Sequence, residues 1–227
     1  MSSALDQRPP LVLASASPRR RELLGLLGVP FAVRDAAIDE AAEPEPARAK
    51  ARAVEVRDAT VVAADTRIRL DGREIGKAPD ARAAVAMLED LAGRAHEVVT
   101  DVAVVDGARR ELHFAVRTRV RMRPFARADA ERYVATGEPL DAAGSYKIQG
   151  AGGGLVESFE GCLANIVGFP LCHAYEALRW AGRSFPERPE VACQRHFAFV
   201  CPVWRRAQAQ GRFAREGASY ATWSEAR

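Results

Sequence analysis

Short apolar runs bounded by turn residues recur along most of this 227-residue chain. Such runs predict buried strands, and alternation of apolar with polar residues predicts a strand with one solvated face. Val116, Val120 and Met122 alternate with arginines in the second way. The dipeptide Asp71-Gly72 is typical of a two-residue hairpin turn. Strands are expected at residues 11–15, 31–34, 60–64, 67–70, 73–75, 97–105, 112–122 and 155–159.

Other stretches place apolar residues three and four positions apart, which predicts amphipathic helices. Ser17 and Pro18 are a typical N-cap and first helical residue, and Gly28 ends that helix. Helices are expected at residues 18–27, 46–57, 80–92, 126–136 and 170–180. Strands and helices mix without strict alternation, so the predicted fold is α/β, with a mixed, bent sheet and flanking helices that form two lobes.

The pattern changes at both ends of the chain. Residues 1–10 are expected to be a tail, residues 11–181 a single domain, and residues 182–227 a C-terminal extension. Prolines, arginines and isolated aromatic residues without a sustained period follow Gly182. The extension is therefore left open between a packed segment, a flexible tail and a partner-binding arm.

Composition excludes several classes of protein. With 48% hydrophobic and 28% charged residues, the chain has enough apolar content for a core and is not expected to be disordered. No apolar run is long enough for a membrane span or a signal peptide, so a cytoplasmic location is the default expectation. A net charge of +3 gives no reason to expect nucleic acid or a membrane as a general partner.

Cysteine and lysine are unevenly placed. The four cysteines, at positions 162, 172, 193 and 201, lie in the last third of the chain and are expected to be reduced thiols. Zinc ligation by Cys172, Cys193 and Cys201 with nearby histidines is a weak alternative, because the spacing is irregular. Only three of the 33 basic residues are lysines, namely Lys50, Lys77 and Lys147.

The segment from Ser15 to Arg20 has the features of an anion site. Ser15, Ser17, Arg19 and Arg20 lie where a predicted strand meets the N-terminus of a predicted helix. Free amide N–H groups and the helix dipole favour an anion there, and guanidinium groups match phosphate oxygens. A merely well-capped helix is the alternative if the segment is taken alone.

Two carboxylates and two lysines complete a consistent set. Asp65 follows the apolar run at residues 60–64, and Glu40 lies in an acidic loop just before the helix that carries Lys50. Lys77 follows the predicted hairpin. Glu40 and Asp65 could hold a hard divalent cation, Mg²⁺ or Mn²⁺, while the lysines neutralise a polyphosphate. The predicted reaction is metal-assisted attack of water on a phosphoanhydride.

The glycine-rich segment at residues 148–154 lacks the Gly-Lys-Ser/Thr ending of a phosphate-binding P-loop, so a P-loop kinase or ATPase is not expected. The segment is interpreted as a flexible wall of the site. Its backbone and Gln149 would donate and accept hydrogen bonds with a nucleobase.

Six ordered blocks resemble the Maf-like nucleotide pyrophosphatases between residues 11 and 181. The blocks are LVLASASPRRRELLGLLGVPF, VVAADT, GK at 76–77, MLEDLAGRAHEVVT, GEPLDAAGSYKIQG and NIVGFPL. The resemblance implies a two-lobed fold around a cleft, a homodimer, and metal-dependent hydrolysis of nucleoside triphosphates to monophosphate and pyrophosphate, which clears unwanted nucleotides from the pool.

The resemblance also implies roles for individual residues. Asp65 matches the general base, with Glu40 as a second acidic residue and Lys77 as a further catalytic residue. The substrate-binding positions are Ser15, Ser17, Arg19, Arg20, Lys50, Thr66 and Gln149, and the metal ligands are Glu40 and Asp65.

Two questions about activity stay open at the level of sequence. Gln149 favours the branch that acts on dTTP and UTP, because an amide presents a donor and an acceptor to a pyrimidine edge. The stretch Ser145-Tyr146-Lys147 is closer to the branch that acts on 7-methyl-GTP. Outside this family, the hypotheses are a regulatory protein that binds nucleic acid or the division machinery, and a phosphatase that removes only the terminal phosphate.

Overall fold

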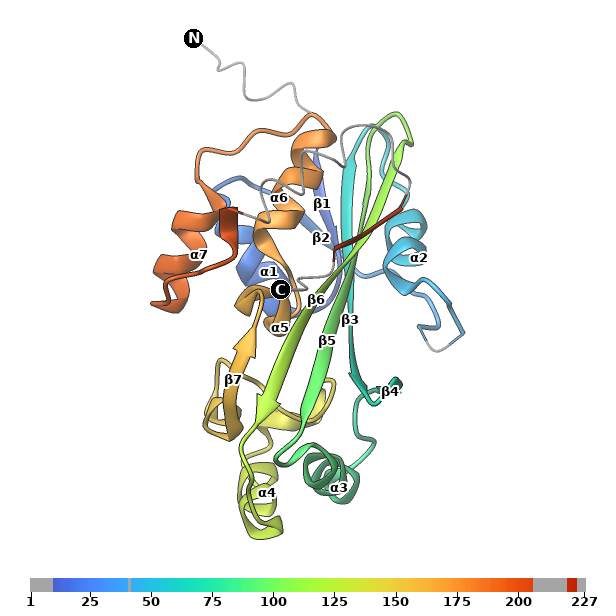
Figure 1. Cartoon of the computed structure of the whole chain (residues 1–227). Coiled ribbons are helices and arrows are strands. Elements are labelled where there is room, and N and C mark those ends of the chain that lie inside the picture. Colours follow the sequence, from blue (N-terminus) through green and yellow to red (C-terminus); the bar gives the residue numbers. More distant parts are fainter. Residues whose placement is uncertain (1–9, 41, 206–219, 224–227) are drawn as a thin grey trace. The chain divides into compact units, whose positions relative to one another are not determined.

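A computed structural model gives the fold (Figure 1). The structure describes residues 10–40, 42–205 and 220–223. The predicted tail, apart from Pro10, and residues 206–219 and 224–227 of the predicted extension lie outside the described residues.

Helices and strands alternate irregularly along the chain (Figure 1). The strands are β1 Leu11–Ala14, β2 Ala32–Arg34, β3 Thr60–Leu70, β4 Arg73–Ile75, β5 Ala95–Val105, β6 Glu111–Met122, β7 Val156–Glu160 and β8 Tyr220–Trp223. The α-helices are α1 Pro18–Gly25, α2 Pro46–Ala53, α3 Ala81–Leu91, α4 Arg127–Val134, α5 Leu163–Val167, α6 Leu171–Trp180 and α7 Pro189–Phe197. There are also two 3-10 helices: η1 Glu138–Asp141 precedes the glycine-rich segment, and η2 Ala151–Leu155 overlaps its second half.

The described strands form one eight-stranded sheet, with the order β2-β1-β3-β5-β6-β7. Strand β4 pairs with β3, and β8 pairs with β6. Strand β1 runs parallel to both neighbours, so that Val12 lies opposite Ala32 and Val61. The β3–β4 and β6–β7 pairs are antiparallel. The prediction of a mixed α/β fold is therefore confirmed.

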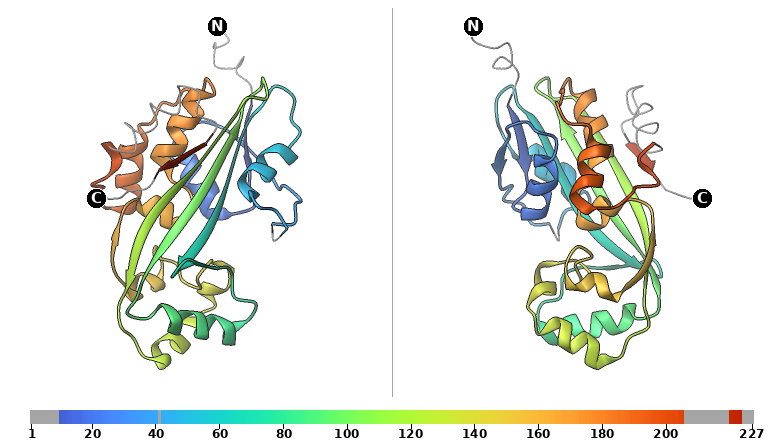
Figure 2. Two further views of the ribbon diagram at one scale, coloured as in Figure 1. Left: turned by 45° about the vertical axis from the view of Figure 1, so that its right-hand side comes forward. Right: turned by 90° about the vertical axis from the view of Figure 1, so that its left-hand side faces the viewer.

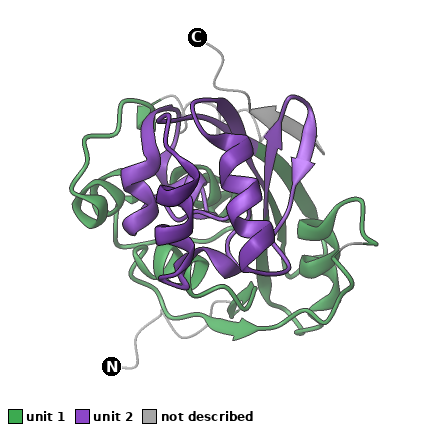
Figure 3. Cartoon of the chain, turned by 90° about the horizontal axis from the view of Figure 1, so that it is seen from below, with its two compact units in different colours: residues 1–65, 101–115, 171–223 green, residues 66–100, 116–170, 224–227 purple. Residues whose placement is uncertain are grey.

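The chain divides into two compact units, in line with the two predicted lobes (Figure 3). Among the described residues, unit 1 comprises residues 10–40, 42–65, 101–115, 171–205 and 220–223, and unit 2 comprises residues 66–100 and 116–170. Strands β3, β5 and β6 each contribute residues to both units.

Small side chains form much of the core of unit 1. Ala47 and Ala51 on α2 are fully buried and lie one helical turn apart, on one face of the helix. They share a hydrophobic cluster with Ala14 of β1 and Ala63 of β3. Alanine has no side chain beyond Cβ, so α2 packs closely on these strands.

Between residues 171 and 205, unit 1 contains helices α6 and α7. Helices α6 and α7 contact each other (Figure 2). Within the described ranges, no helix has the length and hydrophobicity needed to cross a bilayer.

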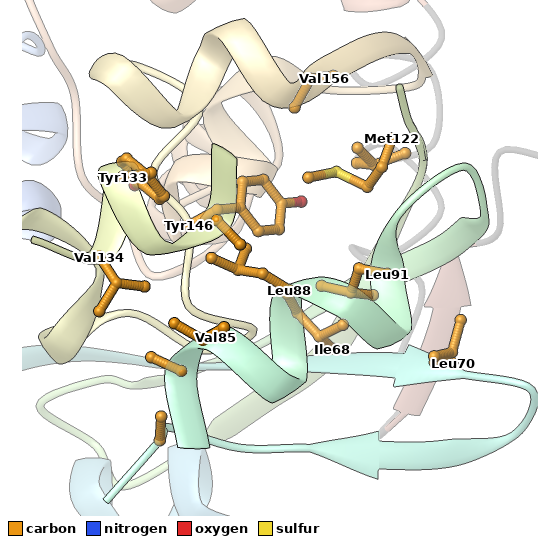
Figure 4. Packing of buried hydrophobic residues seen from close by; sticks show 14 of the residues in the cluster. Ile68, Leu70, Val85, Leu88, Leu91, Met122, Tyr133, Val134, Tyr146 and Val156 are labelled. Atoms are coloured by element: carbon orange, nitrogen blue, oxygen red, sulfur yellow. The ribbon is translucent and has the colours of Figure 1, made fainter. Parts of the chain in front are cut away.

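Unit 2 has a core built around α3 (Figure 4). Asp80 caps α3 by accepting a hydrogen bond from the amide of Ala83 at 2.8 Å. The helix buries Val85, Leu88 and Leu91 in a cluster that also contains Tyr146. The apolar periodicity from which this helix is predicted is thus the face that fills the core.

Three differences from the sequence-based expectations have local causes. Strand β3 is continuous from Thr60 to Leu70. Buried and less buried residues alternate after Asp65, as in a strand, and β4 pairs with this second half. Helix α2 ends at Ala53, four residues early, and the buried Val54 already has extended backbone. Helix α7 begins at Pro189 within the stretch where no structure is predicted.

The core of unit 2 contains a histidine whose titration can be followed. His96 is 3% exposed, and its Nε2 atom lies 2.8 Å from the hydroxyl of Tyr146. Burial lowers the pKa of His96 to about 4. The unfolded chain, in which the pKa is near 6.5, therefore binds a proton at a pH where the folded chain does not, and stability falls between pH 6.5 and 4.

We expect the free energy of unfolding to drop by about 2 kcal/mol between pH 7 and pH 5 through His96 alone. Denaturant titrations at both pH values measure the drop. His96→Gln should be less stable at pH 7 but should show a drop smaller by about that amount. Equal drops in the two proteins would contradict a neutral, buried His96.

Candidate active site

The turn between β1 and α1 organises three predicted anion-binding residues around hydroxyl oxygens. Ser17 caps α1, and its Oγ accepts a hydrogen bond from the amide of Arg20 at 3.4 Å. The Oγ of Ser15 accepts from the amide of Ser17 and from Nη1 of Arg20, each at 3.2 Å. The turn therefore directs a guanidinium group to the N-terminus of a helix, as anion binding requires.

The Arg20 guanidinium lies in an electrostatic cluster within unit 1. Burial lowers its pKa, and the charge of Arg19 acts in the same direction. The negative charges of Asp65 and Glu40 raise its pKa and offset part of this effect. Arginine keeps its proton in proteins, so a positive charge persists here beside two carboxylates.

Lys50 joins the two predicted carboxylates. Its Nζ lies 2.9 Å from Oε1 of Glu40 and 3.0 Å from Oδ1 of Asp65. The Lys50 side chain is 6% exposed, and that of Asp65 is 11% exposed, whereas Glu40 is 55% exposed. Helix α2 supplies the lysine and β3 supplies the aspartate. A buried ammonium needs such partners, because an unpaired charge would be costly to bury.

Asp65 is not at the end of a strand, as the sequence suggests, but inside β3. The apolar run ends at Ala64, yet the backbone stays extended for six more residues. The carboxylate is therefore held on regular, hydrogen-bonded backbone, which fixes its position more firmly than a loop would.

The carboxylates of Glu40 and Asp65 fit the donor set of a hard divalent cation. Magnesium is often held by one or two carboxylates together with phosphate oxygens of the substrate. Among the described residues, no group of three or more His, Cys, Asp or Glu side chains could hold a metal by itself. The Lys50 ammonium lies within 3.0 Å of one oxygen of each carboxylate. One oxygen of each carboxylate is therefore already in contact with a positive charge.

Thr66, Lys77 and Gln149 belong to unit 2. The hydroxyl of Thr66 lies 3.0 Å from that of Thr100. Lys77 is exposed and forms an isolated antiparallel bridge with Ala143 through its backbone. Gln149 is exposed in a turn at the start of the glycine-rich segment. Of the ten predicted residues, unit 1 thus contains seven and brings Ser15, Ser17, Arg20, Glu40, Lys50 and Asp65 into direct or electrostatic contact.

Sequence reasoning missed the residues that support these side chains in unit 2. Thr100 contacts Thr66, and its hydroxyl also donates to the carbonyl of Asn165 at 3.2 Å. Glu138 accepts hydrogen bonds from the glycine-rich segment. Both residues fall inside the sequence blocks that resemble the Maf-like family. A single sequence carries no signal, however, of contacts between residues so far apart along the chain.

The cysteines give no support to a zinc site. Burial raises the pKa of Cys172 and raises that of Cys193 to about 12. Among the described residues, which include Cys172, Cys193 and Cys201, no group of three or more His, Cys, Asp or Glu side chains could hold a metal ion.

Comparisons with known proteins agree with the geometry. Residues 10–181 match the family model described as Maf-like protein. A dTTP/UTP pyrophosphatase of Anaeromyxobacter sp. (strain Fw109-5) is 51% identical over 189 residues, which cover 78% of this chain and 91% of that protein. A dTTP/UTP pyrophosphatase of Moorella thermoacetica is 49% identical over 180 residues, which cover 74% of this chain and 93% of that protein.

A solved structure, that of the Staphylococcus aureus Ham1 protein, aligns with 50% of this chain and 71% of that chain, with 17% identity and a TM-score of 0.39. The family match covers most of the described residues, and relatives near 50% identity align over almost their whole length. This chain therefore belongs to the Maf-like protein family.

Proposed function

We propose that this protein hydrolyses dTTP and UTP to the nucleoside monophosphate and pyrophosphate. The observation that carries the proposal is the contact of Lys50 with both Asp65 and Glu40, beside Arg20, in a chain whose relatives are named dTTP/UTP pyrophosphatases. Acidic groups that accept a proton or hold a cation lie here next to groups that neutralise phosphate.

In the proposed reaction, water attacks the α-phosphorus, the bond to the bridging oxygen breaks, and pyrophosphate leaves. Asp65 accepts the proton of the attacking water as general base. Arg19, Arg20 and the lysines Lys50 and Lys77 stabilise the negative charge that develops on the phosphates. A divalent cation, held by Glu40 and Asp65, would supply further charge neutralisation.

Gln149 is the proposed base-recognition residue. Its amide can donate to a carbonyl oxygen and accept from the ring N–H of uracil or thymine. The stretch that favours 7-methyl-GTP at the level of sequence has another use in the fold, because Ser145 and Tyr146 are buried in unit 2. A homodimeric state and a cytoplasmic location stay predictions.

A panel of triphosphates tests the activity and its specificity together. We expect the purified protein with Mn²⁺ to release pyrophosphate from dTTP and UTP, with kcat/KM at least about 10-fold above that for 7-methyl-GTP, dATP or dCTP. Chromatography of the products distinguishes monophosphate from diphosphate. Release of orthophosphate would support a terminal phosphatase, and salt-sensitive nucleic-acid binding without turnover would support a regulatory protein.

Asp65→Asn tests the general base. The change keeps the size of the side chain but removes the group that accepts the proton, so we expect kcat for dTTP to fall about 10²- to 10⁴-fold. The control is Asp35→Asn, which changes an exposed carboxylate in the same unit and should leave kcat unaltered. Wild-type kcat in a folded Asp65→Asn variant would exclude this role.

Removal of divalent cations tests the metal. We expect treatment with EDTA to reduce pyrophosphate release at least about 100-fold, and added Mg²⁺ or Mn²⁺ to restore it. Undiminished turnover in EDTA would mean that the ammonium and guanidinium groups suffice to neutralise the phosphates.

A further inference from the structure

Glu138 makes three hydrogen bonds at one carboxylate, and two of them come from the glycine-rich segment. Its Oε2 accepts from the amide of Ala151 at 3.1 Å, and its Oε1 accepts from the amide of Gly152 at 3.2 Å. Oε1 also accepts from the hydroxyl of Tyr133 at 2.9 Å. The carboxylate thus caps the start of η2, which follows Gln149 in the sequence, whereas Lys147 precedes Gln149.

Tyr133 holds the other side of the same segment. Its hydroxyl, besides donating to Glu138, accepts a hydrogen bond from the amide of Lys147 at 3.0 Å. Tyr133 is 6% exposed and belongs to the core of unit 2 (Figure 4). Tyr133 thus binds the chain before Gln149 directly, at Lys147, and binds the chain after Gln149 through Glu138. Both sides of Gln149 are therefore attached to the buried Tyr133 of α4.

The glycines of the segment are required by these contacts. A Cβ at Gly150 would lie 2.5 Å from Oε1 and 2.7 Å from Oε2 of Glu138. A Cβ at Gly152 would lie 2.5 Å from the Tyr133 hydroxyl oxygen. Real Cβ atoms do not approach so closely. A side chain at Gly150 would displace the Glu138 carboxylate, and one at Gly152 would also meet the backbone nitrogen of Lys147 at 2.8 Å. The segment is held in place by contacts and is not the flexible wall that its composition suggests.

The negative charge on Glu138 favours the hydrogen bonds by which it holds the glycine-rich segment. Partial burial alone would raise its pKa, but the hydrogen bonds from Tyr133, Ala151 and Gly152, with the charge of Lys147, lower the pKa below its usual value. An ionised carboxylate is an acceptor at both oxygens and matches three donors. Hydrogen bonds to a charged acceptor are also stronger than those between neutral groups.

We propose that Glu138 is a positioning residue for nucleobase selection: it holds the 147–152 segment so that Gln149 presents its amide to a pyrimidine. The inference rests on the proposed function, since it assumes that Gln149 contacts the base. Glu138 itself touches neither the base nor the phosphates in this scheme. Its loss should therefore alter selection of the base more than the chemical step.

Glu138→Gln is the first test, because it keeps the shape but turns one acceptor into a donor that faces donors. We expect KM for dTTP to rise about 10-fold while kcat changes less than about 3-fold. The preference for dTTP over dCTP, as a ratio of kcat/KM values, should fall about 10-fold. The matched control is Glu131→Gln, at an exposed glutamate on α4 paired with Arg127, and it should match wild type.

Tyr133→Phe is the second test and removes only the hydroxyl. We expect the same direction of change, with KM for dTTP raised and the dTTP preference reduced. If circular dichroism shows that Glu138→Gln does not fold, the result for Tyr133→Phe tests the positioning role on its own. A purely structural role would lower kcat/KM for dTTP and dCTP by the same factor, and that result would overturn the inference.

The outcomes separate this inference from the proposed function. Failure of the wild-type protein to release pyrophosphate from any triphosphate would refute the function itself. Pyrophosphate release by wild type, together with unchanged base preference in folded Glu138→Gln and Tyr133→Phe, would refute only the positioning role.

Discussion

A nearly buried ammonium between two carboxylates is the constraint on which unit 1 depends. Lys50 reaches Asp65 and Glu40 from α2, and its exposure is too low for water to solvate the charge. An ammonium buried without a partner would be costly, and here two carboxylates compensate its charge. The position of α2 against β3 is therefore fixed by electrostatics as well as by packing.

Packing makes that contact possible. Ala47 and Ala51 bring α2 close to the strands. Lys50, one residue before Ala51, therefore lies within reach of Asp65 on β3. On β1, the buried Leu11–Ala14 run carries the Ser15 turn to the N-terminus of α1. Small and β-branched apolar residues thus set the distances at which the charged groups of the site interact.

Sequence predicted the features that depend on local chemistry. Ser17 with Pro18 defined the start of α1, and Asp71-Gly72 defined the β3–β4 turn, where both residues adopt positive φ. Features that depend on contacts between residues far apart in the sequence could not be predicted from it. The place of Asp65 inside β3 depends on pairing with neighbouring strands, and composition around Gly150 suggested flexibility because the opposing Glu138 lies outside the local window.

The crowded glycines restrict how the specificity of this protein can change over evolution or in the laboratory. A larger residue at Gly150 would displace the Glu138 carboxylate, and one at Gly152 would clash with the backbone of Lys147, whereas the side chain at position 149 is exposed. Under the proposed function, a new nucleobase preference can arise by substitution of Gln149 while the backbone of the segment stays constant. The arrangement that restricts Gly152 therefore leaves the side chain at position 149 open to change.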